Sequence, residues 1–259
     1  MWSLYGVSGI AIGLFMLALF GVAQVKKDNS IVDIGWGIGF VIIALLTFAY
    51  LPGYGARRLL VTGLVAAWGL RLAFHLWLRS LGRGEDFRYA NFRKQWGKSA
   101  VVIALFRVFL MQGAIMLALA YPIILANANP NSHLDAAAYA GFVIWLVGFL
   151  FQAVGDYQLR VFKRRRKRSE DVLTSGLWRY TRHPNYFGEA VMWWGIALIV
   201  LPMSGGWGAL ISAFLINLLL LKISGVPFLD RRYAENAAYQ QYKKETNRFI
   251  PWFPKKQNG

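Results

Sequence analysis

Long apolar stretches recur along this chain and constrain its fold more than any other feature. A helix needs about 20 apolar residues to cross the hydrocarbon core of a bilayer, and stretches of that length follow one another to near residue 226. The composition agrees, because 57% of the residues are hydrophobic and only 16% are charged, unlike a typical soluble domain. We therefore expect an all-α, polytopic membrane protein with seven spanning helices, at residues 4–24, 31–51, 58–80, 101–126, 136–159, 184–202 and 206–226.

The net charge of +17 is placed unevenly along this chain. Lys26-Lys27, the 79–98 loop, the 160–182 loop and the C-terminal tail fall on one side of a seven-span topology, and the opposite side carries few cations. Because cytoplasmic loops carry the excess of Lys and Arg, we expect the N-terminus outside and the C-terminus inside. The expected partner is a lipid membrane and not nucleic acid.

Six consecutive basic residues, Lys163 to Arg168, follow the fifth predicted span. One interpretation is a topology anchor on anionic lipid. The other is a group of cations that helps to hold a phosphorylated cofactor.

The chain has no Cys and three His. This excludes disulfides and thiolate metal sites, and we expect no metal centre. The sequence also carries no Gly-x-Gly-x-x-Gly after a strand and no Walker loop, so a nucleotide must be held by helix ends and loops.

The densest cluster of polar residues lies in the connector before the sixth predicted span. Pro184 suits the first position of a helix, whose free N–H groups and positive dipole end attract anions. We expect this segment to hold a charged cofactor, with candidate residues Arg179, Tyr180, Arg182, His183, Asn185, Tyr186 and Glu189.

Ionisable residues within the spans are costly and are therefore functional candidates. Asp33 opens the second span, either as a helix-start acid or as part of a pocket wall, and Arg71 in the third span needs a partner such as Asp33. That pair is either structural or part of a substrate site. Gln152, Asp156 and Arg160 repeat every four residues and share one helix face. Glu189 follows Asn185 by four residues, so these two also share one face.

Two further segments carry polar and aromatic residues. The loop from Gly84 to Ala90 contains two acids, an arginine and a tyrosine. We expect residues 227–252 to form an amphipathic tail helix with Asp230 and Tyr242, whose aromatic end docks at the membrane interface. Asp230 is either a solvated acid or a ligand for a ribose hydroxyl or an amide.

Four motifs resemble a known family. Leu177-Trp-Arg-Tyr-Thr-Arg-His-Pro-Asn-Tyr-Phe-Gly-Glu189 resembles the signature of the bacterial DUF1295 family, which is related to the C-terminal domain of steroid 5-alpha-reductases. The other three motifs are Glu85-Asp-x-Arg-Tyr89, Ser224-Gly-Val-Pro-Phe-Leu-Asp230, and Tyr239-x-x-Tyr242 with Thr246-x-x-Phe-Ile-Pro-Trp252. The resemblance runs from about residue 30 to the end.

This resemblance implies a membrane reductase that binds NADPH in a cavity facing the cytoplasm, in a bacterial inner membrane. It places the cofactor against Asp156, Asn185 and Glu189. We expect one membrane domain over residues 1–259, with residues 1–130 on the substrate side and residues 131–259 on the cofactor side. The implied reaction reduces a carbon–carbon double bond conjugated to a carbonyl in a steroid-like or isoprenoid substrate that enters from the bilayer.

The catalytic candidates are Asp33, Arg71 and Glu189, because a donor must stabilise charge on the carbonyl oxygen. The cofactor candidates add Arg160, Asp230 and Tyr242 to the connector residues. The chain departs from the steroid enzymes, which grip the ketone with a Gln-Glu pair and a Tyr on earlier spans. This chain has no such pair, and its third span carries no Tyr.

Two alternatives stay open. One is an S-adenosylmethionine-dependent lipid or isoprenylcysteine-type methyltransferase, because those enzymes share the Arg-His-Pro-x-Tyr pattern. They usually carry a Glu-Glu pair where this chain has Leu229-Asp230. The other is a non-enzymatic lipid-binding or transport protein.

Overall fold

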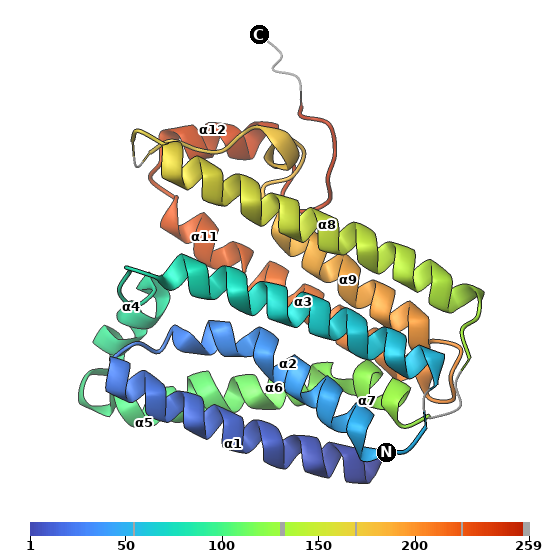
Figure 1. The fold of residues 1–259 in the computed structure, drawn as a ribbon. Helices are drawn as coiled ribbons and strands as arrows, with labels where there is room; N and C mark the ends of the chain where they lie inside the picture. Colours follow the sequence, from blue (N-terminus) through green and yellow to red (C-terminus); the bar gives the residue numbers. More distant parts are fainter. Residues whose placement is uncertain (54, 130–132, 169, 224, 256–259) are drawn as a thin grey trace. The chain divides into compact units, whose positions relative to one another are not determined.

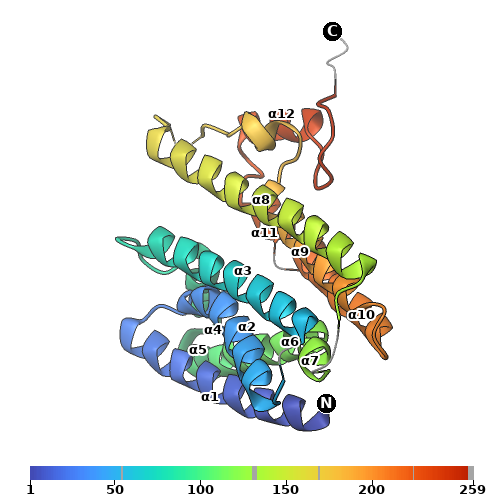
Figure 2. The same cartoon turned by 45° about the vertical axis from the view of Figure 1, so that its right-hand side comes forward.

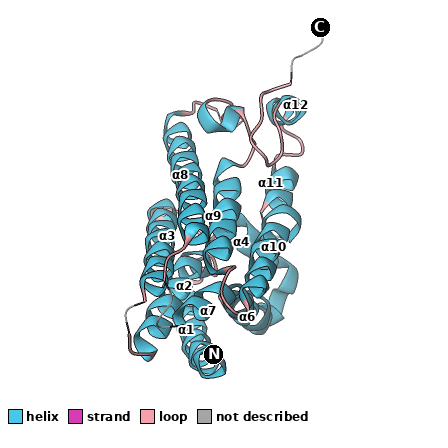
Figure 3. Ribbon diagram, turned by 90° about the vertical axis from the view of Figure 1, so that its right-hand side faces the viewer, coloured by secondary structure: helices cyan, strands magenta, loops and turns pink. Residues whose placement is uncertain are grey.

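The structure is a computed structural model that describes residues 1–53, 55–129, 133–168, 170–223 and 225–255. The described residues are helical and contain no strand, which confirms the expected all-α class (Figure 3). The longer helices are α1 (Trp2–Lys26), α2 (Ile31–Tyr50), α3 (Ala56–Ser80), α8 (Ala136–Arg165) and α9 (Pro184–Val200). The shorter ones are α4 (Phe87–Trp96), η1 (Gly97–Ser99), α5 (Ala100–Ala104), η2 (Leu105–Leu110), α6 (Met111–Leu119), α7 (Tyr121–Asn127), η3 (Gly176–Arg179), η4 (Gly206–Gly208), α10 (Ala209–Leu218), η5 (Leu219–Ile223), α11 (Val226–Arg232) and α12 (Ala237–Glu245).

Six helical segments among the described residues are long and apolar enough to cross a membrane. They are Trp2–Lys26, Ile31–Tyr50, Ala56–Ser80, Phe87–Leu119, Ala136–Arg165 and Gly206–Arg232. The predicted sixth span, 184–202, corresponds to α9, which has 17 residues and a length of about 25 Å, less than the ~30 Å hydrocarbon core. The protein is an integral membrane protein, and the seven-span topology with its orientation stays a prediction.

The chain divides into two compact units. Unit 1 contains Met1–Ala138 and Ile199–Ser212, and unit 2 contains Tyr139–Leu198 and Ala213–Gly259. The expected single membrane domain with a division at residue 130 stays a prediction.

In unit 1, α1, α2 and α3 lie side by side (Figure 1). Two glycines set the spacing of α2 and α3, because a Cβ on Gly69 would lie 2.6 Å from the carbonyl oxygen of Gly37. Small residues that let helix backbones approach closely are typical of membrane helix pairs.

A buried arginine caps the C-terminal end of α2. The Arg58 side chain is 0% exposed and donates to the carbonyl oxygens of Phe48 at 2.5 Å, Leu51 at 3.0 Å and Gly53 at 2.8 Å. The last carbonyls of a helix lack intrahelical donors, and one guanidinium satisfies several of them here.

Replacing Arg58 by methionine should therefore destabilise the protein by about 3 kcal/mol, because helix-end carbonyls lose their donors. Thermal or denaturant unfolding in detergent measures the change. The neighbouring Arg57→Met is the matched control. Arg57 pairs with Asp135 at 2.6 Å, whose side chain is 43% exposed, so its loss should cost about 1 kcal/mol. Equal effects of the two substitutions would contradict this account.

In unit 2, α8 and α9 pack closely along their length, which Figure 2 shows from the side. A Cβ on Gly148 would lie 2.6 Å from the carbonyl oxygen of Gly188, and a Cβ on Gly195 would lie 2.6 Å from that of Gly141. The two glycines on each helix are seven residues apart, so they share one face. We call these four residues the glycine seam.

The expected tail helix over residues 227–252 is wrong as one element. The structure has two short helices instead, α11 and α12, followed by extended chain. Asn236 separates them, because its side chain accepts a hydrogen bond from the backbone N–H of Tyr239 at 2.8 Å and starts α12 as an N-cap. Pro251 and Pro254 lie in the segment that follows. Ser224 of the predicted C-terminal motif lies outside the described residues.

Candidate functional site

Four polar side chains face one another across the α8–α9 pair, next to the glycine seam. Gln152 Nε2 donates to Glu189 Oε2 at 3.1 Å, and Asn185 Nδ2 donates to Asp156 Oδ1 at 3.1 Å. We call these residues the polar ladder. Gln152 and Asp156 lie one turn apart on α8, and Asn185 and Glu189 lie one turn apart on the antiparallel α9, so the two contacts stack as successive rungs.

The polar ladder is largely shielded from solvent. Gln152 is 2% exposed, Asp156 6% and Glu189 8%, and Asn185 is half-buried. Two carboxyl groups and two amides in such a place are costly unless paired, and their amide and carboxylate atoms can bind hydroxyl and carboxamide groups. The sequence predicted that each helix carries these residues on one face, and the structure brings the two faces together.

His183, one residue before α9, is buried without a hydrogen-bond partner. Its side chain is 2% exposed, and among the described residues neither ring nitrogen has a partner. The ring stacks on Tyr186 with centroids 5.5 Å apart. Burial, supported by the charges of Arg182 and Arg248, lowers the pKa of His183 to about 3. The imidazole is therefore neutral at pH 7 and can both donate to and accept from a bound polar group.

The depressed pKa of His183 predicts a loss of stability in mild acid. In the unfolded chain the imidazole takes up a proton near pH 6.5, whereas in the folded protein it does so only near pH 3. The unfolded state thus binds more protons between these two pH values. The free energy of unfolding therefore decreases as the pH is lowered, and at pH 5 it is about 2 kcal/mol smaller than at pH 7.

Unfolding measured between pH 7 and pH 5 tests this prediction. The His183→Gln variant should lose that part of the pH dependence, and the exposed His133→Gln should keep it. An unchanged pH profile in His183→Gln would show that the imidazole is solvated or paired.

Arg182 has a carboxylate partner. Its Nη1 lies 3.1 Å from Asp230 Oδ1, and the Tyr239 hydroxyl donates to the same oxygen at 2.9 Å. Burial and the bond to Asp230 raise the pKa of Tyr239, so its hydroxyl stays a donor.

The segment 178–182 is held by the C-terminal tail. The Tyr242 hydroxyl donates to the carbonyl oxygen of Trp178, the Thr181 hydroxyl donates to that of Phe249 at 2.7 Å, and the Arg182 backbone N–H donates to that of Asn247 at 2.9 Å. Tyr242 therefore positions the connector through its hydroxyl, and Asp230 does so through its ion pair with Arg182.

The remaining cofactor candidates are accessible. Arg179 and Tyr180 are exposed, and Arg160 and Tyr186 are half-buried. Accessible cations beside a buried, unpartnered imidazole and a set of amide and carboxylate groups fit a dinucleotide, which offers phosphates, ribose hydroxyls and a carboxamide. In the part of the chain that the structure describes, no group of three acid or histidine side chains is arranged to hold a metal ion.

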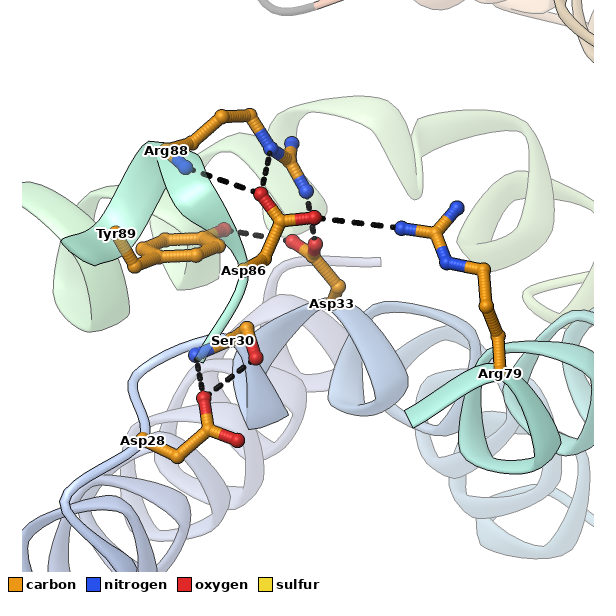
Figure 4. A network of polar contacts seen from close by, with 7 residues as sticks. All are labelled: Asp28, Ser30, Asp33, Arg79, Asp86, Arg88 and Tyr89. Atoms are coloured by element: carbon orange, nitrogen blue, oxygen red, sulfur yellow. Dashed lines mark hydrogen bonds and ion pairs between the residues drawn. The ribbon is translucent and has the colours of Figure 1, made fainter. Parts of the chain in front are cut away.

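A second polar cluster lies in unit 1, at the start of α2 and α4 (Figure 4). Asp33 accepts from Arg88 Nη2 at 2.5 Å and from the Tyr89 hydroxyl at 2.6 Å. Arg88 Nε also donates to Asp86 Oδ1 at 2.9 Å. We call Asp33, Asp86, Arg88 and Tyr89 the Asp33 cluster.

Two acids hold the segment that supplies Arg88 and Tyr89. Asp86 caps α4 by accepting from the Arg88 backbone N–H; burial alone would raise its pKa, but the contacts with Arg88 and Arg79 together lower it. Glu85 pairs with Arg93 at 2.9 Å and accepts from the Asn29 backbone N–H at 2.8 Å.

The ionic partner of Asp33 is therefore Arg88, where the sequence suggested Arg71. Arg71 is half-buried on α3. Tyr89 is the residue that the sequence analysis missed as a site candidate, because the tyrosine was sought on the third span. It is 5% exposed. The signal was present in the Glu85–Tyr89 motif, whose arginine and tyrosine are the residues that contact Asp33.

Comparison with known proteins now adds to this geometry. A family model described as "Protein of unknown function (DUF1295)" matches residues 19–246. The chain belongs to the DUF1295 family. This confirms the resemblance found in the connector and tail motifs.

Named relatives of this DUF1295 member are matched over shorter stretches. The chain is 35% identical over 65 residues to 3-oxo-5-alpha-steroid 4-dehydrogenase 1 of Mus musculus, covering 25% of this chain and 26% of that enzyme. The Homo sapiens enzyme of the same name is 34% identical over 71 residues, 27% of each chain. The match spans about a quarter of these relatives.

An uncharacterized protein of Schizosaccharomyces pombe is 25% identical over 286 residues, covering 95% of this chain and 81% of that protein. The chain is thus steroid-reductase-like over a limited segment, and its extended match is to a protein without a named activity.

Proposed function

We propose that this protein is an NADPH-dependent membrane reductase that saturates a carbon–carbon double bond conjugated to a carbonyl in a lipophilic, steroid-like or isoprenoid substrate. The observation that carries the proposal is the polar ladder beside the unpartnered His183 in unit 2. The partial similarity to 3-oxo-5-alpha-steroid 4-dehydrogenases supports the reaction class.

The proposed cofactor residues lie in unit 2. Arg160, Arg179 and Tyr180 are accessible and suit the phosphates, whereas the amide and carboxyl groups of Asp156, Asn185 and Glu189 suit the nicotinamide end, with His183 and Tyr186 beside them. Bound NADPH supplies a hydride for a polarised carbon. Arg182, Asp230 and Tyr242 keep the connector in place through their contacts with one another and with the tail. We place this site on the cytoplasmic side of a bacterial inner membrane.

The proposed substrate residues lie in unit 1. Reduction of an enone places negative charge on the carbonyl oxygen, and a preorganised donor in a dry site stabilises that charge. The Arg88 guanidinium, held by Asp33, supplies such donors and positive charge. The Tyr89 hydroxyl donates to Asp33 in this structure and becomes a donor to the carbonyl oxygen when it turns from Asp33 to the substrate. Tyr89 thereby joins Asp33 and Arg71 as a catalytic candidate.

The test uses purified protein in detergent with NADPH and a set of lipophilic enones. We expect enone-dependent oxidation of NADPH and a product heavier by two hydrogens, with one deuterium transferred from labelled NADPH. Glu189→Gln should raise the KM for NADPH about tenfold, because a charge-assisted hydrogen bond is lost. The control is Glu245→Gln, a half-buried acid on α12 whose carboxylate accepts from Gln241.

Absence of turnover with every enone, together with no change in NADPH binding in Glu189→Gln, would overturn the proposal. If Glu189→Gln turns over the enone with normal NADPH affinity, the proposed reaction is supported, but the assignment of the polar ladder to the cofactor site is wrong.

A further inference from the structure

The C-terminal end of α8 forms an open hollow lined mainly by cations. Its lining consists of Phe162, Arg165, Arg166, Lys167, Arg168 and Asp171, and its volume is about 480 Å³. We call this the basic hollow. A second hollow adjoins it and shares Phe162, Arg168 and Asp171.

The basic hollow carries an excess of positive charge. Four of its residues are cations, and Asp171 accepts a hydrogen bond from the Arg168 backbone N–H at 3.1 Å. Glu170 lines the adjoining hollow. Even with Glu170 included, two carboxylates do not balance four cations, so the hollow attracts an anion such as a phosphate.

An exposed apolar stripe leads along α8 towards the basic hollow. Its residues recur every three or four positions and therefore share one helix face. Their exposed fractions are 57% for Val143, 45% for Val147, 51% for Leu150, 40% for Val154 and 58% for Tyr157. Such a stripe suits contact with acyl chains.

The length of α8 places the two features at matching depths. The helix has 30 residues and measures about 45 Å, equal to the ~40–45 Å of a bilayer with its headgroup layers. The stripe then lies along the hydrocarbon region, and the basic hollow reaches the headgroups.

We propose that the basic hollow binds the headgroup phosphate of an anionic phospholipid whose acyl chains lie along the stripe. The inference does not depend on the reductase proposal. It also favours the lipid interpretation of the Lys163–Arg168 run over the cofactor interpretation. The phosphate of a soluble cofactor would make no contact with the apolar stripe, which continues into the hydrocarbon region.

The experiment measures the Tm of the full chain in neutral detergent with added phosphatidylglycerol, phosphatidylcholine or inorganic phosphate. We expect phosphatidylglycerol alone to raise the Tm. Neutralising the basic hollow should weaken the apparent phosphatidylglycerol affinity tenfold or more, since each cation near an anionic surface contributes roughly 1 kcal/mol. The variant is Arg165→Gln, Arg166→Gln, Lys167→Gln and Arg168→Gln.

A matched control removes four exposed cations elsewhere and should keep the response. It is Lys26→Gln, Arg83→Gln, Lys94→Gln and Arg79→Gln. A third variant keeps the charges by Arg→Lys changes at residues 165, 166 and 168, and it should keep most of the response, which separates charge from folding.

Three results would each overturn the inference. The first is an equal phosphatidylglycerol response in both fourfold glutamine variants. The second is a Tm shift that inorganic phosphate reproduces, which identifies a free-anion site. The third is a hollow variant that loses stabilisation by NADPH while its response to phosphatidylglycerol is intact, which assigns the hollow to the cofactor.

Discussion

Leucine at Gly148 is expected to force α8 and α9 apart and to destabilise the protein by about 3 kcal/mol. A Cβ at this position would lie 2.6 Å from the carbonyl oxygen of Gly188 and 2.7 Å from the backbone nitrogen of Met192. Backbone atoms cannot move aside as a flexible side chain can, so the added atoms must separate the helices. The polar ladder lies on the same pair and should be disrupted with it.

Denaturant or thermal unfolding in detergent measures this effect, and Gly63→Leu is the matched control. Gly63 also lies within a membrane-spanning helix, but a Cβ there meets nothing within 4 Å. Its replacement should change stability little. Similar losses in the two variants would mean that leucine is tolerated equally on both faces and that the glycine seam is not a close contact.

The substitutions Asp33→Asn and Tyr89→Phe are each expected to lower kcat for enone reduction on the order of 10²–10³-fold. This is the effect typical of removing one donor from a preorganised site. Asp33→Asn removes the carboxylate that accepts from both Arg88 and Tyr89. Tyr89→Phe removes the hydroxyl and keeps the ring, so the packing of α4 is preserved.

Kinetics with NADPH and enone separate this role from a structural one. Stabilisation by NADPH should be retained in both variants, because the cofactor is assigned to unit 2. The controls are Asp28→Asn, whose carboxylate bonds to Ser30, and Tyr139→Phe, whose ring is 61% exposed. Normal turnover in both Asp33→Asn and Tyr89→Phe would remove the Asp33 cluster from the reaction.

Hydropathy alone located the six candidate spanning helices, because the length of each apolar run decides where a helix can cross a bilayer. The predicted ends of α1, α2 and α3 differ from the observed ends by two residues or fewer. Hydropathy failed where polar sequence is helical: the fourth segment begins at Phe87 rather than residue 101, since Asp86 supplies an N-cap, and α8 continues through basic residues to Arg165.

The candidate site was predictable as separate faces and not as an assembled cluster. The four-residue spacing of Gln152 with Asp156 and of Asn185 with Glu189 gave each face. The pairing of the faces depends on the glycine seam, whose seven-residue spacing on both helices was a usable signal. The contact of Asp33 with Tyr89 joins residues 56 positions apart, and no local pattern specifies it.

The most direct test of the account compares stabilisation of the purified protein by NADPH, NADH and S-adenosylmethionine. A ligand at about 100 times its dissociation constant adds roughly 2.7 kcal/mol to the folded state. We predict a clear stabilisation by NADPH, lost in Glu189→Gln and retained in Glu245→Gln. Stabilisation by S-adenosylmethionine alone would contradict the reductase and assign the connector to methyl transfer. No stabilisation by any of the three would contradict a cofactor site at the polar ladder.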